Sequence, residues 1–292
     1  MAGGDQSPSP ARSVCVLQTL FRSSPFGPVA LQQYQFVLDG FVAGLVASLA
    51  CGLGVLPLLI TRLRIPERIS LGYGFAGGLM MAASVYNLLM PAIEQGSEAA
   101  TQLGPILKIL TGLLAGSAFI WWVESQLTPE RLKTSRLLTP FGSRIETLVF
   151  LAMFFHSVPE GVAVGVGYGA ETHHDRMSGL GFYIAAAIAV HNIPEGLAVA
   201  LPMRARGARI VRCFCFAVLT SLPQPVAAVP AAMAVWLFEP LTLPLLGFAA
   251  GAMMYLVIDE LLPEALESGD HTSISWAFMI GFSVMVFVQV VL

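Results

Sequence analysis

The sequence predicts an all-α integral membrane protein with eight transmembrane helices and both termini outside. Of the 292 residues, 56% are hydrophobic and only 11% are charged, whereas soluble proteins carry about a quarter charged residues. The mean hydropathy of +0.75 agrees with this class. Apolar runs long enough to cross a bilayer recur along the chain, and the basic residues alternate from loop to loop.

The apolar runs define the spans, because a helix needs roughly 20 apolar residues to cross the hydrocarbon layer. Eight runs satisfy this length, beginning near Phe36, Leu71, Pro105, Ile145, Leu180, Val211, Leu241 and Ser275. Their connections are too short for a soluble domain, so we expect residues 34–292 to form one eight-helix domain. Residues 1–33 are rich in Ser, Pro and Gly and predict a mobile N-terminal tail, with a targeting segment as the alternative.

The lysines and arginines predict the orientation of the bundle. Eleven of the 15 basic residues follow the first, third and fifth spans, namely Arg62, Arg64, Arg68, Arg131, Lys133, Arg136, Arg144, Arg204, Arg206, Arg209 and Arg212. Cytoplasmic loops carry the excess of basic residues, so these loops should be cytoplasmic. The net charge of -3 gives no indication of a nucleic-acid partner.

A repeated motif lies inside the fourth and fifth spans. The nonapeptide HSVPEGVAV, which begins at His156, recurs as HNIPEGLAV, which begins at His191. On a helix each copy puts its histidine on the same face as a glutamate one turn later, Glu160 or Glu195. An ionisable side chain near the bilayer centre costs at least ~2.5 kcal/mol, so it usually has a function. A single buried histidine or glutamate is often an ordinary core residue, but two copies in consecutive spans favour a binding site.

The ligand types indicate a divalent transition metal. Imidazole nitrogen with carboxylate oxygen suits zinc and its neighbours, whereas magnesium and calcium prefer oxygen alone. Pro159 and Pro194 should bend their helices and free carbonyl groups. Gly161 and Gly196 should allow another helix to approach closely.

Other polar residues are weaker candidates. Asn87 and Glu94 form a polar stripe on the second span, and the acidic side chains of the seventh span, Asp259, Glu260 and Glu264, are either a solvated helix end or an exit for cations. We favour the exit for Glu260 and Glu264. The outer-loop pair His173 and His174 fits solvated surface residues better than metal collectors. The four cysteines, Cys15, Cys51, Cys213 and Cys215, indicate no disulfide framework and fit buried small residues.

At these motifs the sequence resembles the Zrt/Irt-like (ZIP) family of divalent metal transporters. The segment HNIPEG at 191–196 carries most of the resemblance. It is supported by HSVPEG at 156–161, GLMMAAS at 78–84 and LLPE at 261–264. The resemblance implies a ZIP-type bundle, usually a homodimer, that passes metal from outside or from an organelle lumen into the cytosol. It also implies that spans one, four, five and six move against the other four in an elevator-like cycle.

The family pattern carries over to named positions. His156, Glu160, His191, Asn192 and Glu195 match its transport site, and Met80 falls where some members have a methionine beside that site. Ser157 and Gln224 depart from it, because the family commonly has Asn and Glu there in a second metal position. Gln224 is then an oxygen ligand or a hydrogen-bonding residue at a helix break. We therefore expect one well-formed metal position, with the second weak or absent.

The functional expectation is transport of a divalent ion, most of all zinc, with iron or manganese as alternatives. The ion is the substrate, and no prosthetic group is expected. The expected location is the plasma or inner membrane, with an organelle membrane as the alternative. A metal sensor or scaffold that does not transport is the second hypothesis. An intramembrane metalloenzyme is the weakest, because the HExxH motif of zinc proteases does not occur in the chain.

Overall fold

The computed structural model describes residues 34–59, 65–97, 103–127, 144–173 and 177–291. Over these residues the chain consists of helices and short connections, without a strand. Within the described residues, eight segments are long and apolar enough to cross a membrane, and each begins close to its predicted position. The predicted all-α fold with eight spans is therefore confirmed. The predicted tail, His174 and most of the basic loops lie outside the described residues.

Four spans are single helices and four are interrupted. The single helices are α6 (Leu103–Gln126), α8 (Arg144–Ala170), α9 (Leu180–Ala205) and α14 (His271–Val291). The interrupted spans are the first, α3 (Gln35–Leu53) with η1 (Leu56–Leu59); the second, α4 (Ile65–Ala83), η2 (Ser84–Leu89) and α5 (Met90–Ser97); the sixth, α10 (Ile210–Ser221) and α11 (Pro223–Leu237); and the seventh, η5 (Glu239–Leu241), α12 (Thr242–Leu256), η6 (Val257–Leu261) and α13 (Leu262–Ser268).

A proline interrupts the sixth span, and π-helical turns interrupt the second and seventh spans. The sixth span breaks at Leu222, because Pro223 and Pro225 lack the amide hydrogens that would continue the helical hydrogen bonds. Both η2 and η6 are π-helical turns, which are rare and frequently mark functional sites. The turn in η6 carries Glu260, and the turn in η2 carries Asn87, whose buried amide makes no hydrogen bond.

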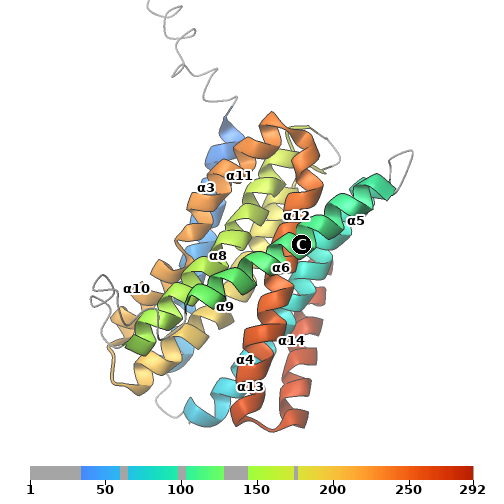
Figure 1. The fold of residues 1–292 in the computed structure, drawn as a ribbon. Coiled ribbons are helices and arrows are strands. Elements are labelled where there is room, and N and C mark those ends of the chain that lie inside the picture. Colours follow the sequence, from blue (N-terminus) through green and yellow to red (C-terminus); the bar gives the residue numbers. More distant parts are fainter. Residues whose placement is uncertain (1–33, 60–64, 98–102, 128–143, 174–176, 292) are drawn as a thin grey trace, which may run out of the picture.

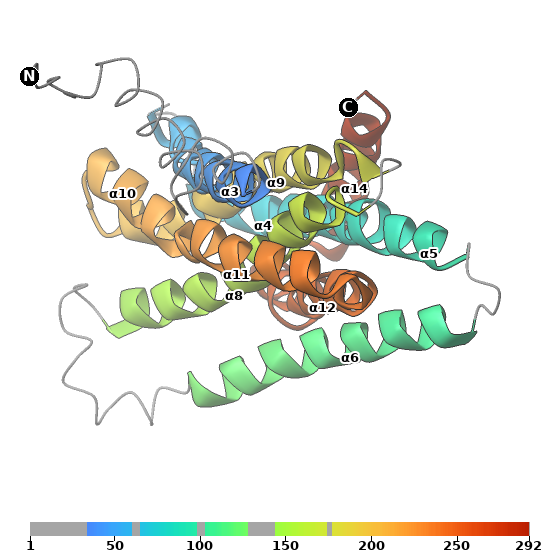
Figure 2. The same cartoon turned by 90° about the horizontal axis from the view of Figure 1, so that it is seen from above.

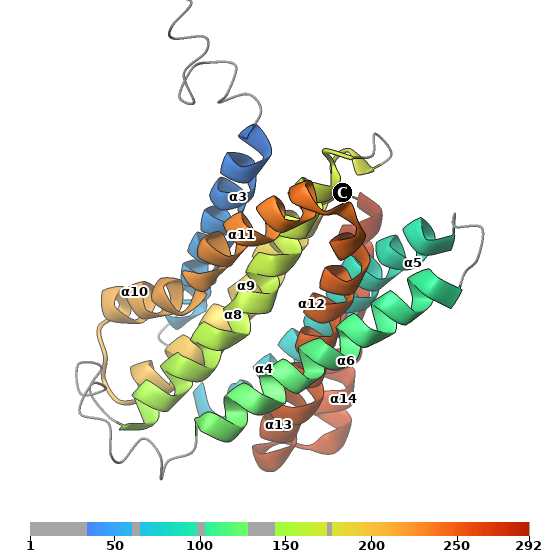
Figure 3. The same ribbon diagram turned by 45° about the horizontal axis from the view of Figure 1, so that its top comes forward.

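The helices form two groups (Figures 1–3). Helices α3, α8, α9, α10 and α11 pack mainly against one another, whereas α12 packs on α6 and α14 packs on α4. Figure 3 shows the first group on the left and the second on the right. They meet where α8 contacts α12 and where α9 contacts α4. The repeated motif on α8 and α9 therefore belongs to helices that border the other group.

Glycines bring helices into backbone contact. A Cβ atom on Gly116 of α6 would lie 1.9 Å from the carbonyl oxygen of Phe248 on α12, and one on Gly251 of α12 would lie 2.0 Å from that of Leu113 on α6. Small residues spaced four apart are typical of membrane helix interfaces. The α6–α12 pair accordingly packs through glycine faces rather than through interlocking large side chains.

The ends of α9 and α14 are capped by local hydrogen bonds. At the end of α9 the amides of Gly207 and Ala208 donate to the carbonyls of Arg204 and Met203. Gly207 has a φ of 85°, which only glycine adopts easily. In the first turn of α14 the Ser273 amide donates to Asp270, which precedes the helix, at 2.9 Å, and this bond lowers the pKa of the Asp270 carboxyl.

Replacing Gly116 with alanine should destabilise the protein by about 1–3 kcal/mol, because the new methyl group meets backbone that cannot move independently. The thermal unfolding midpoint in detergent measures this effect. Gly104 on the same helix is the control, since a Cβ there has no atom within 4 Å. Gly104→Ala should leave the midpoint unchanged or raise it, and equal losses in both variants would contradict the packing argument.

Candidate metal centre

The two motif copies lie on neighbouring helices, and α11 packs against the first copy. Both α8 and α9 continue through their prolines, Pro159 and Pro194. Beside the ligands, a Cβ on Gly161 would lie 2.3 Å from the carbonyl oxygen of Gln224, and one on Gly196 would lie 1.7 Å from that of Cys51. The predicted close approach at both glycines is confirmed.

The buried core of the site is a pair formed by one residue from each copy. His191 Nε2 lies 3.3 Å from Glu160 Oε1, and the two side chains are 0% and 1% exposed. Ligand atoms that share a tetrahedral ion at about 2.1 Å are separated by roughly 3.4 Å. The spacing of this pair therefore suits two ligands of one metal ion.

Gln224 and Asn192 hold this pair in a hydrogen-bonded layer. The Gln224 amide nitrogen donates to Glu160 Oε2, and its oxygen accepts a bond of 3.2 Å from Asn192. Asn192 also donates to the Ala47 carbonyl at 2.9 Å, which ties α9 to α3. Gln224 therefore acts as a hydrogen-bonding residue beside the helix break rather than as a free oxygen ligand.

The remaining predicted ligands lie outside this layer. Glu195 is 4% exposed, and its Oε2 has no hydrogen-bond partner. The Ser157 hydroxyl donates to the Met153 carbonyl on its own helix at 3.1 Å. Met80 is buried in the apolar core that also contains Val164. The layer therefore brings together four of the eight predicted residues: Glu160, His191, Asn192 and Gln224.

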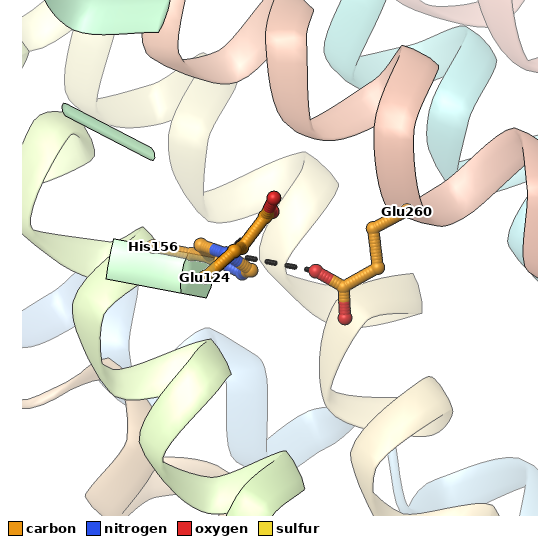
Figure 4. A group of neighbouring side chains, drawn as sticks. All are labelled: Glu124, His156 and Glu260. Atoms are coloured by element: carbon orange, nitrogen blue, oxygen red, sulfur yellow. Dashed lines mark ion pairs between the residues drawn. The ribbon is translucent and has the colours of Figure 1, made fainter. Parts of the chain in front are cut away.

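His156 faces a different set of acids. Its Nε2 lies 3.8 Å from Glu124 Oε1 of α6 and 3.6 Å from Glu260 Oε2 of η6. Figure 4 shows the Glu260 carboxylate pointing toward the ring, with Glu124 overlapping His156 in this view. Within the described residues, this is the one group of three His, Cys, Asp or Glu side chains whose ligand atoms all lie within 4.8 Å of one another.

This cluster can bind a cation. Both ring nitrogens of His156 and Oε1 of Glu124 are buried without hydrogen-bond partners, and buried polar atoms normally have one. The nitrogen–oxygen distances are too long for hydrogen bonds but close to the separation of two ligands of one ion. One imidazole and two carboxylates form a set that suits zinc and similar divalent ions.

Sequence reasoning missed Glu124. It is a single acid near the end of the third span, in the segment WWVESQ, without a repeat to mark it. Its intramembrane position was a usable signal, since such acids normally face a functional interior. Glu260, which was favoured as part of an exit, lies in the cluster. It also lines a surface cavity of about 500 Å³ together with Asp259, Glu264, Glu267 and His271.

Comparison with known proteins gives consistent matches. The family model described as ZIP Zinc transporter matches residues 141–289. Zinc transporter GufA of Myxococcus xanthus is 34% identical over 252 residues, which are 83% of this chain and 94% of that protein. Zinc transporter ZIP11 of Homo sapiens is 44% identical over 160 residues, which are 53% of this chain and 46% of that protein.

A protein of Arabidopsis thaliana is also similar, with 34% identity over 243 residues. The match covers 82% of this chain but 37% of the plant protein. The chain thus spans less than half of the human and plant relatives and nearly all of the bacterial one. The resemblance seen in the motifs therefore extends over most of the chain.

Replacing Glu124 with glutamine should weaken binding of a divalent ion at the His156 cluster by about tenfold or more, or roughly 1.4 kcal/mol, because one of three ligands loses its charge. Titration of the purified protein with Co²⁺, followed by its visible absorption, measures this change. Glu94→Gln is the control, since Glu94 lies on α5 and outside the cluster. Equal cobalt affinity in wild type and Glu124→Gln would contradict the assignment of Glu124 as a ligand.

Proposed function

Because this chain belongs to the ZIP zinc transporter family, we propose that it carries divalent transition-metal ions, most of all zinc, through the membrane into the cytosol. The relatives named above are transporters, not enzymes. Iron and manganese are the alternative substrates, because both accept nitrogen and oxygen ligands. The ion is the transported substrate.

The observation that carries this proposal is the pair of adjoining ligand sets on α8. Glu160 joins His191 in the interior, whereas His156, one turn away on the same helix, faces Glu124 and Glu260 of the other helix group. An ion bound at the first set has a second set within reach at the boundary between the groups. A closed structural site would not need this second set.

Cavities at both ends of the helix bundle support a route for ions through the protein. One cavity of about 890 Å³ lies between α5, α6 and α9, and its lining includes Glu94, Tyr183 and Glu239. The acid-lined cavity at Glu260 lies at the opposite, predicted cytoplasmic end. In this proposal, ions enter through the first cavity and leave past Glu260 and Glu264.

The division into two helix groups supports an elevator-like cycle. The group of α3, α8, α9, α10 and α11 contains Glu160, His191, Asn192, Glu195 and Gln224. Its members pack mainly against one another, so the group can move as a unit relative to α6, α12 and α14. In this cycle His156 moves with the ion, while Glu124 and Glu260 stay with the other group.

Gln224 supports a single metal position in the hydrogen-bonded layer. Its amide nitrogen donates to Glu160 and its oxygen accepts from Asn192, so it occupies the space where a carboxylate would face a second ion. An amide contributes no negative charge, and the repulsion between two divalent ions would be less compensated. A homodimer in the plasma or inner membrane, or in an organelle membrane, remains the expectation from the family resemblance.

Zinc uptake into proteoliposomes tests the function directly. His191→Ala should lower the initial rate by at least about tenfold, because it removes one ligand of the buried pair. His173→Ala is the matched control, since that ring lies in an outer loop, 3.1 Å from the Val235 carbonyl oxygen, and should keep the wild-type rate. Binding of zinc without uptake by the wild type would favour a sensor over a transporter.

Gln224→Glu should raise the number of tightly bound zinc ions per chain from one to two. The substitution replaces a hydrogen-bond donor by a carboxylate beside Glu160, which restores charge for a second ion. Metal analysis of the purified protein after gel filtration gives the stoichiometry. Gln35→Glu, an amide-to-acid change at the exposed start of α3, serves as the control. Two equally tight ions in the wild type would contradict the single-position proposal.

A further inference from the structure

A second layer of polar side chains lies one helical turn from the hydrogen-bonded layer. Cys51 follows Ala47 by four residues on α3, and Glu195 follows Asn192 by three on α9. Ser221 precedes Gln224 by three residues at the end of α10. Each step is about one turn, and all three lead toward the predicted cytoplasmic end. The three helices therefore present a second set of groups beside the first.

This second layer is buried and contains an unsatisfied carboxylate oxygen. Cys51 and Ser221 are 0% exposed and Glu195 is 4% exposed. Glu195 Oε2 has no hydrogen-bond partner, whereas both carboxylate oxygens of Glu160 in the first layer are paired. Leaving a buried polar atom unpaired costs about 1–3 kcal/mol. The unpaired Glu195 oxygen indicates that a further group binds in this layer.

Cys51 places a free thiol in this layer. The thiol is hydrogen-bonded to the hydroxyl groups of Ser221 and Thr220 and interacts electrostatically with Glu195. A Cβ on Gly196, the residue after Glu195, would lie 3.1 Å from its sulfur atom. The thiol is therefore held against α9 at the level of the unpaired carboxylate oxygen.

We propose that Cys51, Glu195 and Ser221 form a sulfur-containing metal position for soft divalent ions such as zinc and cadmium. Sulfur with carboxylate and hydroxyl oxygen suits these ions and not magnesium or calcium. On binding, the thiol S–H bond breaks, a sulfur–metal bond forms and the proton passes to the solvent, without electron transfer. This inference rests on the proposed function, because the transported ion is the one that would reach this position. The two layers are one helical turn apart. A single ion therefore binds first in one layer and then in the other.

Cadmium spectroscopy tests the ligand set without relying on transport. A variant with Cys15, Cys213 and Cys215 replaced by serine keeps Cys51 as the single thiol of the chain. Addition of Cd²⁺ to this purified variant should produce the ultraviolet sulfur-to-cadmium absorption, and X-ray absorption of the bound cadmium should detect one sulfur neighbour. Further replacement by Cys51→Ser should abolish both signals and lower cadmium affinity by about tenfold or more.

A second variant keeps the thiol and separates a ligand role from a folding defect. Glu195→Gln in the single-thiol protein should retain the sulfur signal but weaken cadmium binding, and gel filtration of each variant checks that it is folded. A single-thiol protein without sulfur around cadmium would overturn the inference. If that protein still carries zinc into proteoliposomes, only the inference fails. If the sulfur signal is present without uptake by the wild type, only the proposed function fails.

Discussion

The contact between Gly161 and the backbone of Gln224 determines the chemistry of the buried site. A Cβ atom at Gly161 would lie 2.3 Å from the Gln224 carbonyl oxygen. The backbones of α8 and α11 can therefore approach this closely at position 161 only because the residue is glycine. At this distance the Gln224 amide reaches Glu160, the residue before Gly161. A carboxylate in the membrane interior needs such a partner, because desolvation without compensation is costly. Close packing and polar satisfaction therefore depend on the same residue.

The same contact distinguishes the two motif copies. Glu160 is held by Gln224 and His191, whereas Oε2 of Glu195 has no partner. A group with all its hydrogen bonds made has to exchange one of them to bind an ion, but an unpaired group does not. Glu195 is thus the carboxylate that is open to a ligand in this conformation. The two copies of the motif therefore differ in reactivity because different helices pack beside them.

Much of the fold could be predicted from the sequence, and the site only in part. The eight spans follow from run length, and the helix approach at Gly161 and Gly196 follows from small residues beside the ligands. Spacing puts His156 and Glu160 one turn apart, but it cannot decide which neighbouring helix each one faces. His156 turns to Glu124 and Glu260, which are separated from it in sequence and reach it only through tertiary packing. The π turn that carries Glu260 has no signal in residue propensities.

Charge balance explains why amides accompany the acids. Glu160 in the first layer and Glu195, one turn away in the second, carry two negative charges when both are ionised, which match one divalent ion, while Asn192 and Gln224 add hydrogen bonds without charge. Moving uncompensated charge into a low-dielectric interior is far more costly than moving a neutral assembly. In the second layer, thiolate and carboxylate again give two negative charges. For the ion proposed here, two negative charges in a layer would give a neutral complex, whereas a second ion in the same layer would leave an excess of positive charge.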